Sequence, residues 1–484
     1  MAYEAVIGLE CHIQLKTRSK MFCACPAEFG AEPNSNVCPV CLGLPGALPA
    51  TNHAAVDAAL RLGLALGGTI RGRSVFARKN YFYPDMPKNY QITQYDQPLC
   101  EGGSLEVLVE GVGRRFDLTR VHLEEDTGKS FHPERHGDRR VSRVDFNRAG
   151  VPLLELVTEP VFRAPAECAA FLTALRRLVR WLEISDGDME KGHLRCDANV
   201  SLRPAGTTAL GTKSEIKNLN SIRGVEKGIT AELARQERVL GEGGRIVQAT
   251  LLYDADHDRL AVMRSKEHAH DYRYFPEPDL PALEVGAGWL ETARLGLPVL
   301  PWAREREFMA LGLPWYDAGV LSEQSELAEY ALEVMRGGEA KLASNWLMTD
   351  VLRVLKERDW TPARWRQQVP AARLGDFLAR VAAQSLPGPL AKQVFGWMAD
   401  EAGDVPELLQ RHGVRVQSSN EELEPLVREV LDQNPGPVAQ YLAGKTATLA
   451  FLVGQVMKKS GGQAVPQVVQ SLLKRELETR GART

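Results

Sequence analysis

The chain has 484 residues, of which 44% are hydrophobic and 25% are charged, and its formal net charge is −3. This length predicts two to four domains of globular composition. The sequence holds no apolar run of the roughly 18 residues needed to cross a bilayer and no signal-peptide pattern, and its charge excludes a global nucleic-acid footprint but not a local basic patch. We therefore expect a cytoplasmic protein.

The first predicted element is a β-strand over 5–15, in which successive side chains point to opposite faces. One face is apolar throughout. The other carries Glu10, His12 and Gln14, spaced by roughly 7 Å. A carboxylate and an imidazole on one strand face suit a divalent metal ion, although an ordinary solvated strand face has the same pattern.

Four of the eight cysteines cluster in two close pairs after this strand. In a reducing compartment this spacing predicts a zinc site of four thiolates, which leaves no open coordination position and is therefore structural. Four thiols kept for packing are the alternative. The paired cysteines are Cys23, Cys25, Cys38 and Cys41, and those expected in the core are Cys11, Cys100, Cys168 and Cys196.

A helix is predicted over 52–66 from the spacing of its Ala and Leu residues. The segment 77–98 that follows is dense in tyrosine and proline, which argues against a helix and for an ordered, extended loop. Its cations Arg78, Lys79 and Lys88, together with the aromatic rings, suit a polyanion or a nucleotide. A packed aromatic turn is the alternative.

Strands and helices then follow to about residue 290, and they predict an α+β domain with a largely antiparallel sheet that has one charged face. In the first of these strands His122 and Glu124 share a face, whereas Glu125 points the other way; in the fourth, Arg195 and Asp197 lie on the polar face. The predicted strands are 116–125, 143–147, 151–157, 194–203 and 212–220, and the predicted helices are 166–183 and 224–240.

From about residue 295 the sequence is helical by period and composition, most clearly over 341–358. We expect three domains: an α+β domain over 1–292, an all-α helical domain over 293–408 and a small α-helical tail domain over 409–484. The short helices of the tail are expected to break at 434–437 and at 460–462.

Two Gly-Lys pairs, at 128–129 and 444–445, resemble the end of a phosphate loop, but the glycine that this loop requires five residues earlier is missing from both. ATP, if it binds, therefore binds by another scheme.

The charged strand faces offer such a scheme. If their strands are neighbours, several carboxylates and an imidazole converge, which is costly unless a cation neutralises them. Mg²⁺ suits a few carboxylates together with phosphate oxygens, so this pattern predicts phosphoryl transfer. Ordinary salt bridges on separate strands are the alternative. The converging residues are Glu10, His12, Glu124, Glu125 and Asp197, and the candidates to hold phosphates are Arg78, Lys79, Lys88 and Arg195.

Long motifs along the whole chain resemble the B subunits of the aspartyl/glutamyl-tRNA(Asn/Gln) amidotransferases. The zinc cysteines are present in only some members of that family, so their role rests on their spacing. The motifs are IGLECHIQL (7–15), ARKNYFYPDMPKNYQITQYDQP (77–98), VHLEEDTGKS (121–130), LRCDANVSLRP (194–204), KSEIKNLNS (213–221), DYRYFPEPDLP (271–281), SNWLM (344–348) and FLVGQVMKKSGGQAVPQVVQSLLKREL (451–477).

The resemblance implies a heterotrimer that converts misacylated Glu-tRNA(Gln) or Asp-tRNA(Asn) to the amide form. The A subunit, a glutaminase, is expected to release ammonia from glutamine, and the C subunit is expected to hold the other two together. The B subunit is expected to bind the tRNA and to phosphorylate the side-chain carboxylate with Mg-ATP, so that ammonia displaces phosphate. The first domain is then the cradle domain of this family, and the tail touches the tRNA.

Carried over by motif, Glu10, His12 and Glu125 look like Mg²⁺ or phosphate-site residues with Glu124 beside them, and Lys79 and Glu125 look like polar groups at the mouth of an ammonia path. Asp197 rests on sheet geometry as much as on the family. A zinc-containing tRNA-binding scaffold, with catalysis in partner chains, is the alternative function.

The tail fits tRNA contact by its charge, because basic residues outnumber acidic ones after residue 443 in a chain that is acidic overall. A solvated helix surface is the alternative. The tail cations are Lys445, Lys458, Lys459, Lys474, Arg475, Arg480 and Arg483, of which Lys458, Lys459, Lys474 and Arg475 are the expected tRNA-binding residues.

Overall fold

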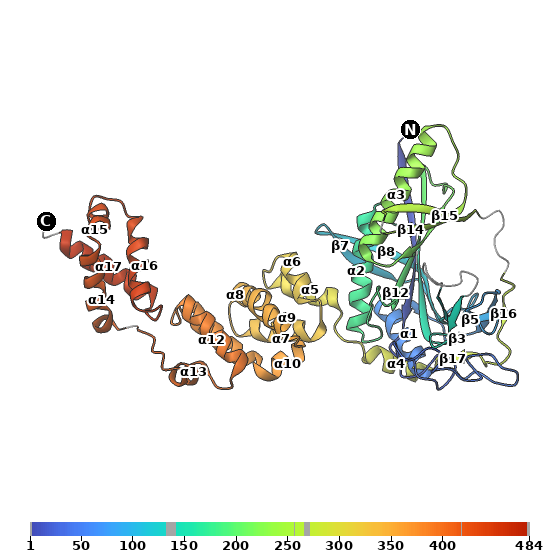
Figure 1. Ribbon diagram of the computed structural model, residues 1–484, viewed down its shortest axis with the longest axis horizontal. Coiled ribbons are helices and arrows are strands. Elements are labelled where there is room, and N and C mark those ends of the chain that lie inside the picture. Colours follow the sequence, from blue (N-terminus) through green and yellow to red (C-terminus); the bar gives the residue numbers. More distant parts are fainter. Residues whose placement is uncertain (1, 132–141, 256, 266–271, 418, 482–484) are drawn as a thin grey trace. The chain divides into compact units, whose positions relative to one another are not determined.

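The computed structural model describes residues 2–131, 142–255, 257–265, 272–417 and 419–481. The chain divides into two compact units, Met1–Trp302 and Ala303–Thr484 (Figure 1). None of the helices in the described ranges has both the length and the apolar character that crossing a bilayer requires. Asp271, which opens one of the motifs above, and Arg483 in the tail lie outside these ranges.

A ten-stranded sheet forms the framework of the first unit. All its neighbouring strands pair antiparallel apart from β13 and β14, which are parallel. This confirms the predicted α+β class with a largely antiparallel sheet. The order is β15 (Arg259–Ser265), β14 (Ala249–Asp254), β13 (Ser214–Leu219), β12 (Leu194–Pro204), β1 (Tyr3–Gln14), β11 (Pro152–Thr158), β8 (Val112–Glu125), β6 (Cys100–Glu101) and β2 (Thr69–Ile70), with β7 (Ser104–Val109) paired to β8.

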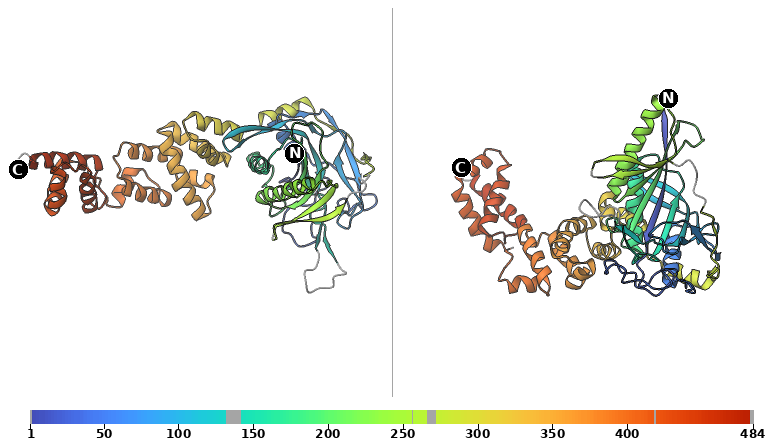
Figure 2. Two further views of the ribbon diagram at one scale, coloured as in Figure 1. Left: turned by 90° about the horizontal axis from the view of Figure 1, so that it is seen from above. Right: turned by 45° about the vertical axis from the view of Figure 1, so that its right-hand side comes forward.

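The apolar face of this sheet is the core of the unit, as the alternation of the first strand predicts. Ile7, Leu9, Cys11 and Ile13 of β1 are buried in it. Helices α2 (Pro165–Trp181) and α3 (Ile222–Gly241) cover this face side by side (Figures 1 and 2), and α1 (His53–Ala65) packs against β8. These helices therefore do not cover the polar face of the central strands, where the candidate functional residues lie.

The segment 77–98 is not the loop that its prolines predict. Strands β4 (Phe76–Asn80) and β5 (Tyr90–Gln94) pair antiparallel, and β16 (Phe275–Pro276) joins β4 on the other side. Pro84 and Pro87 lie in the connection between the two strands, where a missing N–H costs no ladder hydrogen bond. Two further small sheets join β3 (Arg73–Ser74) to β17 (Leu283–Glu284) and β9 (Lys129–Phe131) to β10 (Arg143–Asp145).

The second unit consists, over its described residues, of helices joined by loops, with one isolated β-bridge between Gln417 and Ala464. The predicted helix 341–358 is continuous but contains a π-helical turn, and the helices of the tail break at the expected Pro and Gly positions. The last four helices enclose an apolar core of their own. The helices are α5 (Pro301–Ala310), α6 (Trp315–Leu321), α7 (Ser325–Arg336), α8 (Ala340–Trp346), η1 (Leu347–Val351), α9 (Leu352–Arg358), α10 (Pro362–Gln368), α11 (Ala371–Ala382), α12 (Gly388–Asp400), α13 (Val405–Arg411), α14 (Asn420–Gln433), α15 (Pro435–Leu442), α16 (Thr448–Lys459) and α17 (Pro466–Gly481), preceded in the first unit by α4 (Ala287–Leu295).

Candidate functional site

A row of ionisable side chains crosses four strands on the polar face of the sheet. The register sets Arg195 of β12 opposite His12 of β1, His12 opposite Glu155 of β11, and Glu155 opposite His122 of β8. Directly opposed residues in a sheet have their Cβ atoms about 4.5–5.5 Å apart. The sequence predicted a polar face on each of these strands except β11, and strand pairing brings the faces together.

Glu10 and Glu124 join this row, so that three carboxylates surround His12. Its Nε2 atom lies 3.6 Å from a carboxylate oxygen of Glu124, 3.6 Å from one of Glu155 and 3.9 Å from one of Glu10. The Nε2 atom of His122 lies 3.4 Å from Glu155, and its Nδ1 atom is buried with no hydrogen-bond partner among the described residues. We call these five residues (Glu10, His12, His122, Glu124 and Glu155) the acidic cluster.

Burial and mutual repulsion shape the protonation of this cluster. Burial raises the pKa of Glu10 and of Glu124, and the charge of Glu155 raises both further. Burial alone would raise the pKa of Glu155, but His122 and His12 hold it well below its usual range. Burial alone would lower the pKa of His12, but Glu155 and Glu124 raise it to about 9. A proton on His12 therefore offsets part of the negative charge, as a bound cation would.

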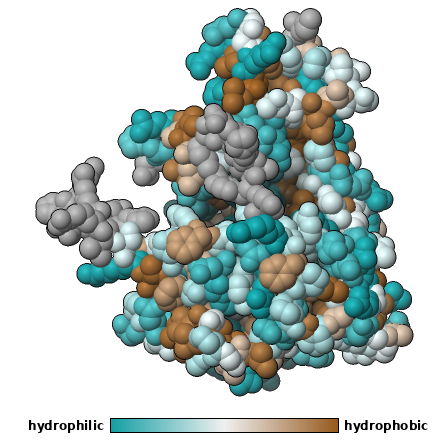
Figure 3. All heavy atoms as spheres, turned by 90° about the vertical axis from the view of Figure 1, so that its right-hand side faces the viewer, coloured by the Kyte–Doolittle hydropathy of each residue, from teal (hydrophilic) through white to brown (hydrophobic). Residues whose placement is uncertain are grey.

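Lys79 links the acidic cluster to a group of aromatic rings. Burial alone would lower its pKa, but the charge of Glu124 raises it, and its Nζ atom lies 5.1 Å from the centre of the Tyr272 ring. Tyr274 stacks on Tyr95 with 4.0 Å between ring centres. The side of the unit where β5 and β16 lie carries hydrophobic residues scattered among hydrophilic ones (Figure 3).

Glu125 occupies a different place from Glu124, because successive residues of β8 point to opposite faces. Its carboxylate pairs with Lys88 and accepts a 2.9 Å hydrogen bond from the Ile92 backbone N–H. Both side chains line a cavity of about 190 Å³ beside the cysteine loops. The expected grouping of Glu125 with Glu10 and His12 is thus replaced by a grouping of Glu155 with them.

The other expected phosphate-site cations are engaged by carboxylates. Arg78 makes two hydrogen bonds, of 2.7 and 2.8 Å, to Glu277, and Arg195 makes one of 2.8 Å to Asp126. Asp197 lies opposite Glu10 in register, as the sheet geometry requires, and binds Lys217.

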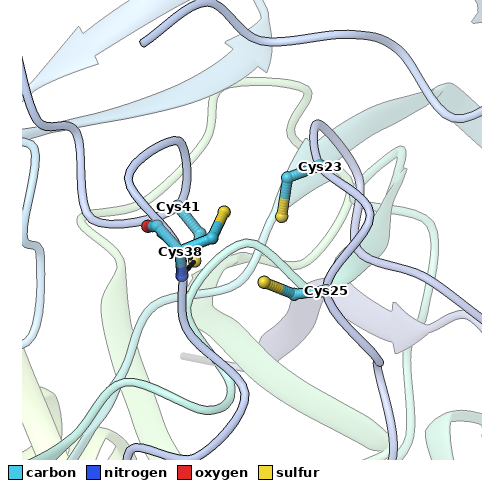
Figure 4. A group of neighbouring side chains, drawn as sticks. All are labelled: Cys23, Cys25, Cys38 and Cys41. Atoms are coloured by element: carbon cyan, nitrogen blue, oxygen red, sulfur yellow. Dashed lines mark hydrogen bonds between the residues drawn. The ribbon is translucent and has the colours of Figure 1, made fainter.

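The four clustered cysteines converge as their spacing predicts. Their sulfur atoms all lie within 4.8 Å of one another, and the pairs Cys23/Cys25 and Cys38/Cys41 face each other from two loops (Figure 4). The Cys23 thiol lowers the pKa of Cys41 to about 4, with help from the Cys38 backbone N–H and Lys20. Four thiolates at this separation fit a structural zinc ion. The remaining four cysteines are buried, as predicted.

The four expected tRNA-binding residues of the tail differ in their surroundings. Lys459 pairs with Glu429, and Arg475 pairs with Glu424. Lys458 and Lys474 are exposed, and no ion pair of either is found within the described part of the chain.

Sequence reasoning missed Glu155 and did not select His122. The available signal was a lone charge inside the apolar run VPLLELV, because a charged residue in a buried strand is rarely there without a partner. The partner could not be named, since the register between β1 and β11 is set by distant contacts.

Comparison with known proteins shows the family to which the chain belongs. A family model described as the GatB/GatE catalytic domain matches residues 5–291, and one described as the GatB domain matches residues 329–477. The B subunit of the aspartyl/glutamyl-tRNA(Asn/Gln) amidotransferase of Moorella thermoacetica is 49% identical over 479 residues, covering 99% of this chain and all of the relative. The B subunits of the same name from Chlorobium chlorochromatii and Halorhodospira halophila are each 48% identical, over 480 and 482 residues, with the same coverage of both chains. The chain belongs to the family of aspartyl/glutamyl-tRNA(Asn/Gln) amidotransferase B subunits.

Proposed function

We propose that this chain is the tRNA-binding, transamidating component of an ATP-dependent amidotransferase. It takes Glu-tRNA(Gln), Asp-tRNA(Asn) or both, phosphorylates the side-chain carboxylate of the aminoacyl group, and passes the activated acyl group to ammonia. The observation that carries the proposal is the acidic cluster. In it, carboxylate oxygens of Glu10, Glu124 and Glu155 lie within 3.9 Å of the His12 Nε2 atom, and the His122 Nε2 atom lies 3.4 Å from Glu155.

The acidic cluster fits a divalent cation by its chemistry. Its donors are carboxylate oxygens and imidazole nitrogens, it is largely buried, and the Nδ1 atom of His122 is left without a partner among the described residues. His12, Glu124 and Glu155 would hold the ion, Glu155 taking the place first expected of Glu125 and Glu10 lying beside it. A bound Mg²⁺ neutralises the phosphate oxygens of ATP and orients its terminal phosphoryl group.

A carboxylate cannot exchange its oxygen for nitrogen directly, because an oxide would have to leave. Attack of the carboxylate oxygen on the terminal phosphorus of ATP forms an acyl phosphate and releases ADP. Lys79, beside Glu124, can balance the negative charge on the transferring group, and so can Arg195, opposite His12 in register, although it already pairs with Asp126. Arg78 and Lys88 reach phosphate only by leaving Glu277 and Glu125.

Ammonia then attacks the acyl carbon, the bond to phosphate breaks, and the added nitrogen must lose a proton. Glu10 is suited to accept it, since burial raises its pKa and a third of its side chain is accessible, against 2% for Glu124. Water would hydrolyse the acyl phosphate, so ammonia is delivered through a guarded path that ends beside Lys79. Glu125, which the family motif also assigns to this mouth, faces Lys88 on the other side of β8.

The remaining parts take supporting roles. Zinc in the four-cysteine site fixes two loops of the first unit. A glutaminase partner (the A subunit of the family) supplies ammonia, the small C subunit holds the complex together, and the domain over 409–484 contacts the tRNA through Lys458, Lys459, Lys474 and Arg475. The complex works in the cytoplasm, where aminoacyl-tRNA is used.

The test compares Glu155→Gln and His12→Ala with the unchanged chain, each purified in complex with the A and C subunits. Misacylated tRNA and ATP are supplied, with ammonium chloride as the nitrogen source so that glutaminase activity is not needed. We expect tRNA-dependent ADP formation and amide formation to fall by roughly 10²–10³-fold, as on removal of a charge-stabilising group, while the Kd for tRNA stays unchanged.

Glu159→Gln is the matched control, because Glu159 follows the same strand as Glu155 and, within the part of the chain that the structure describes, its carboxylate only accepts a hydrogen bond from Thr119. This variant should keep full activity. If both cluster variants keep full ADP formation, the alternative of a zinc-containing tRNA-binding scaffold, with chemistry in partner chains, replaces the proposal.

A further inference from the structure

Lys20 is a fully buried lysine, with none of its surface exposed. An ammonium group is almost never placed there without partners that compensate its lost hydration. Its Nζ atom donates a 2.7 Å hydrogen bond to the Asn36 backbone carbonyl and a 3.3 Å hydrogen bond to that of Phe146, and lies 3.6 Å from the Cys41 sulfur. The three donors of one ammonium group thus have three acceptors.

The contact with Cys41 indicates which charge Lys20 compensates. Four thiolates around one Zn²⁺ carry two surplus negative charges, and charge of that size inside a protein is costly unless a cation or hydrogen-bond donors offset it. Cys41 also accepts a 3.2 Å hydrogen bond from the Cys38 backbone N–H. Lys20 adds a full positive charge at the same sulfur.

The other contacts of Lys20 lead to the end of β8. Phe146 begins the turn that closes at Gly150, whose carbonyl accepts a 2.7 Å hydrogen bond from the Met21 N–H and whose N–H donates a 2.9 Å hydrogen bond to the Asp126 carbonyl. Asn147 in this turn accepts a 2.8 Å hydrogen bond from the Asn36 N–H. The turn therefore joins the cysteine loop to the residue that follows Glu125.

Gly150 lies where the cysteine loop, Lys20 and the end of β8 come close together. Its φ of +86° favours glycine, and a Cβ atom there would lie 3.4 Å from the Cβ of Cys41, 3.5 Å from the Cδ of Lys20 and 3.8 Å from a carboxylate oxygen of Glu125. A zinc ligand, the buried lysine and the acidic end of β8 therefore all meet around one residue.

We propose that Lys20 is the resident counter-cation of the zinc centre and the positioning residue that ties this centre to the acidic end of β8. The inference rests on the proposed zinc ion, and it assigns Lys20 a role toward that ion and none in contact with substrate.

The test uses Lys20→Met, which keeps the unbranched side chain except for its terminal ammonium group and so removes the charge, in the complex with the A and C subunits. Zinc release to a chromogenic chelator should be about 10–100-fold faster, the range typical when partners of metal ligands are removed. In the Co²⁺-loaded protein, the thiolate-to-cobalt charge-transfer band should move to lower energy, since Cys41 loses a hydrogen bond and becomes more electron-rich. Lys16→Met, at an exposed lysine near the same strand end, should leave both unchanged.

A second measurement uses the unchanged protein, so that it holds even where Lys20→Met fails to fold. Lysine acetylation by acetic anhydride is mapped by mass spectrometry before and after zinc is removed with a chelator. Lys20 should be protected only while zinc is bound, and Lys16 should react in both states. The role of Lys20 is overturned if Lys20→Met leaves zinc release and the cobalt spectrum unaltered. It is also overturned if Lys20 stays protected after zinc is removed. A wild-type complex that contains no zinc and takes up no cobalt overturns the zinc proposal instead.

Discussion

Lys88 and Glu125 form an ion pair almost closed to solvent, with 7% and 3% of their side chains exposed. When Lys88 is replaced, the Ile92 N–H is the one donor left to the Glu125 side chain among the described residues. We expect Lys88→Met to destabilise the first unit by roughly 3 kcal/mol or more, because a buried charge loses its partner. Urea unfolding followed by hydrogen exchange of β8 peptides measures this loss.

The double variant Lys88→Met, Glu125→Gln is the control for that experiment. It should recover part of the lost stability, since no unpaired charge remains in the cavity. A single variant that unfolds at the same urea concentration as the unchanged protein would show that water already reaches the pair.

His193 provides a pH test away from the acidic cluster. Burial lowers its pKa, against a smaller opposing effect of Asp186, whose carboxylate lies 3.8 Å away. The folded state therefore resists protonation that the unfolded chain accepts, and stability should be complete above about pH 6.5 and should fall as the pH drops below it. His193→Gln, which cannot titrate, should flatten that fall in a series of melting temperatures from about pH 8 to about pH 5. Equal slopes in the two proteins would contradict the buried, neutral state of His193.

Alternation along strands predicted which side chains share a face, and the structure follows it at Glu124 and Glu125. The convergence argument and the family motifs both group Glu125 with His12, whereas the pleat of β8 directs Glu125 to Lys88. Glu155 escaped prediction for a different reason. Its role depends on the register of β1 against β11, and no local feature of the sequence records a pairing between residues so far apart.

At the scale of elements, helix α1 shows how one residue joins a helix to a loop. The side-chain oxygen of Asn52 caps the helix at the Ala54 and Ala55 N–H groups, and its amide donates to the Ser19 and Lys20 backbone carbonyls at 3.0 and 3.1 Å. Asn52→Ala should cost about 2 kcal/mol or more, roughly one for the cap and the rest for the lost donor bonds. Asn52→Ser, which keeps only the cap, should cost about half of that. If Asn52→Ala and Asn52→Ser lose the same stability in thermal unfolding, the cap contributes nothing and the bonds to the loop account for the whole loss.

Elements with strong hydrophobic periodicity are predicted correctly from the sequence. An element that depends on pairing with a distant segment is not. The helices over 166–183 and 224–240 and the strand over 194–203 lie within two residues of α2, α3 and β12. For the hairpin of β4 and β5 the sequence predicts a loop, because prolines and tyrosines dominate its local pattern. Pairing with β16, almost two hundred residues later, helps to hold it as a sheet.

At the scale of the whole molecule, the chain divides between Trp302 and Ala303, close to the residue at which strand alternation ends in the sequence. The candidate catalytic residues and the basic residues of the tail follow this division. The acidic cluster and the cysteines belong to the first unit, whereas the basic tail lies in the second, so the proposed activity uses one unit for reaction and the other for holding RNA.

Counterion release offers a test of that division. Each lysine that neutralises an RNA phosphate steepens the dependence of log K on log salt by about 0.7–0.9. Lys458 and Lys474 are exposed and have no ion pair among the described residues, whereas Lys459 and Arg475 already pair with Glu429 and Glu424. We therefore expect Lys458→Ala and Lys474→Ala each to lower the slope for tRNA binding by nearly one. Lys459→Ala and Arg475→Ala should change it less, since their charges are partly neutralised before tRNA arrives. Filter binding across a salt series on the intact complex measures all four slopes, and four unchanged slopes would place the phosphate contacts outside these residues.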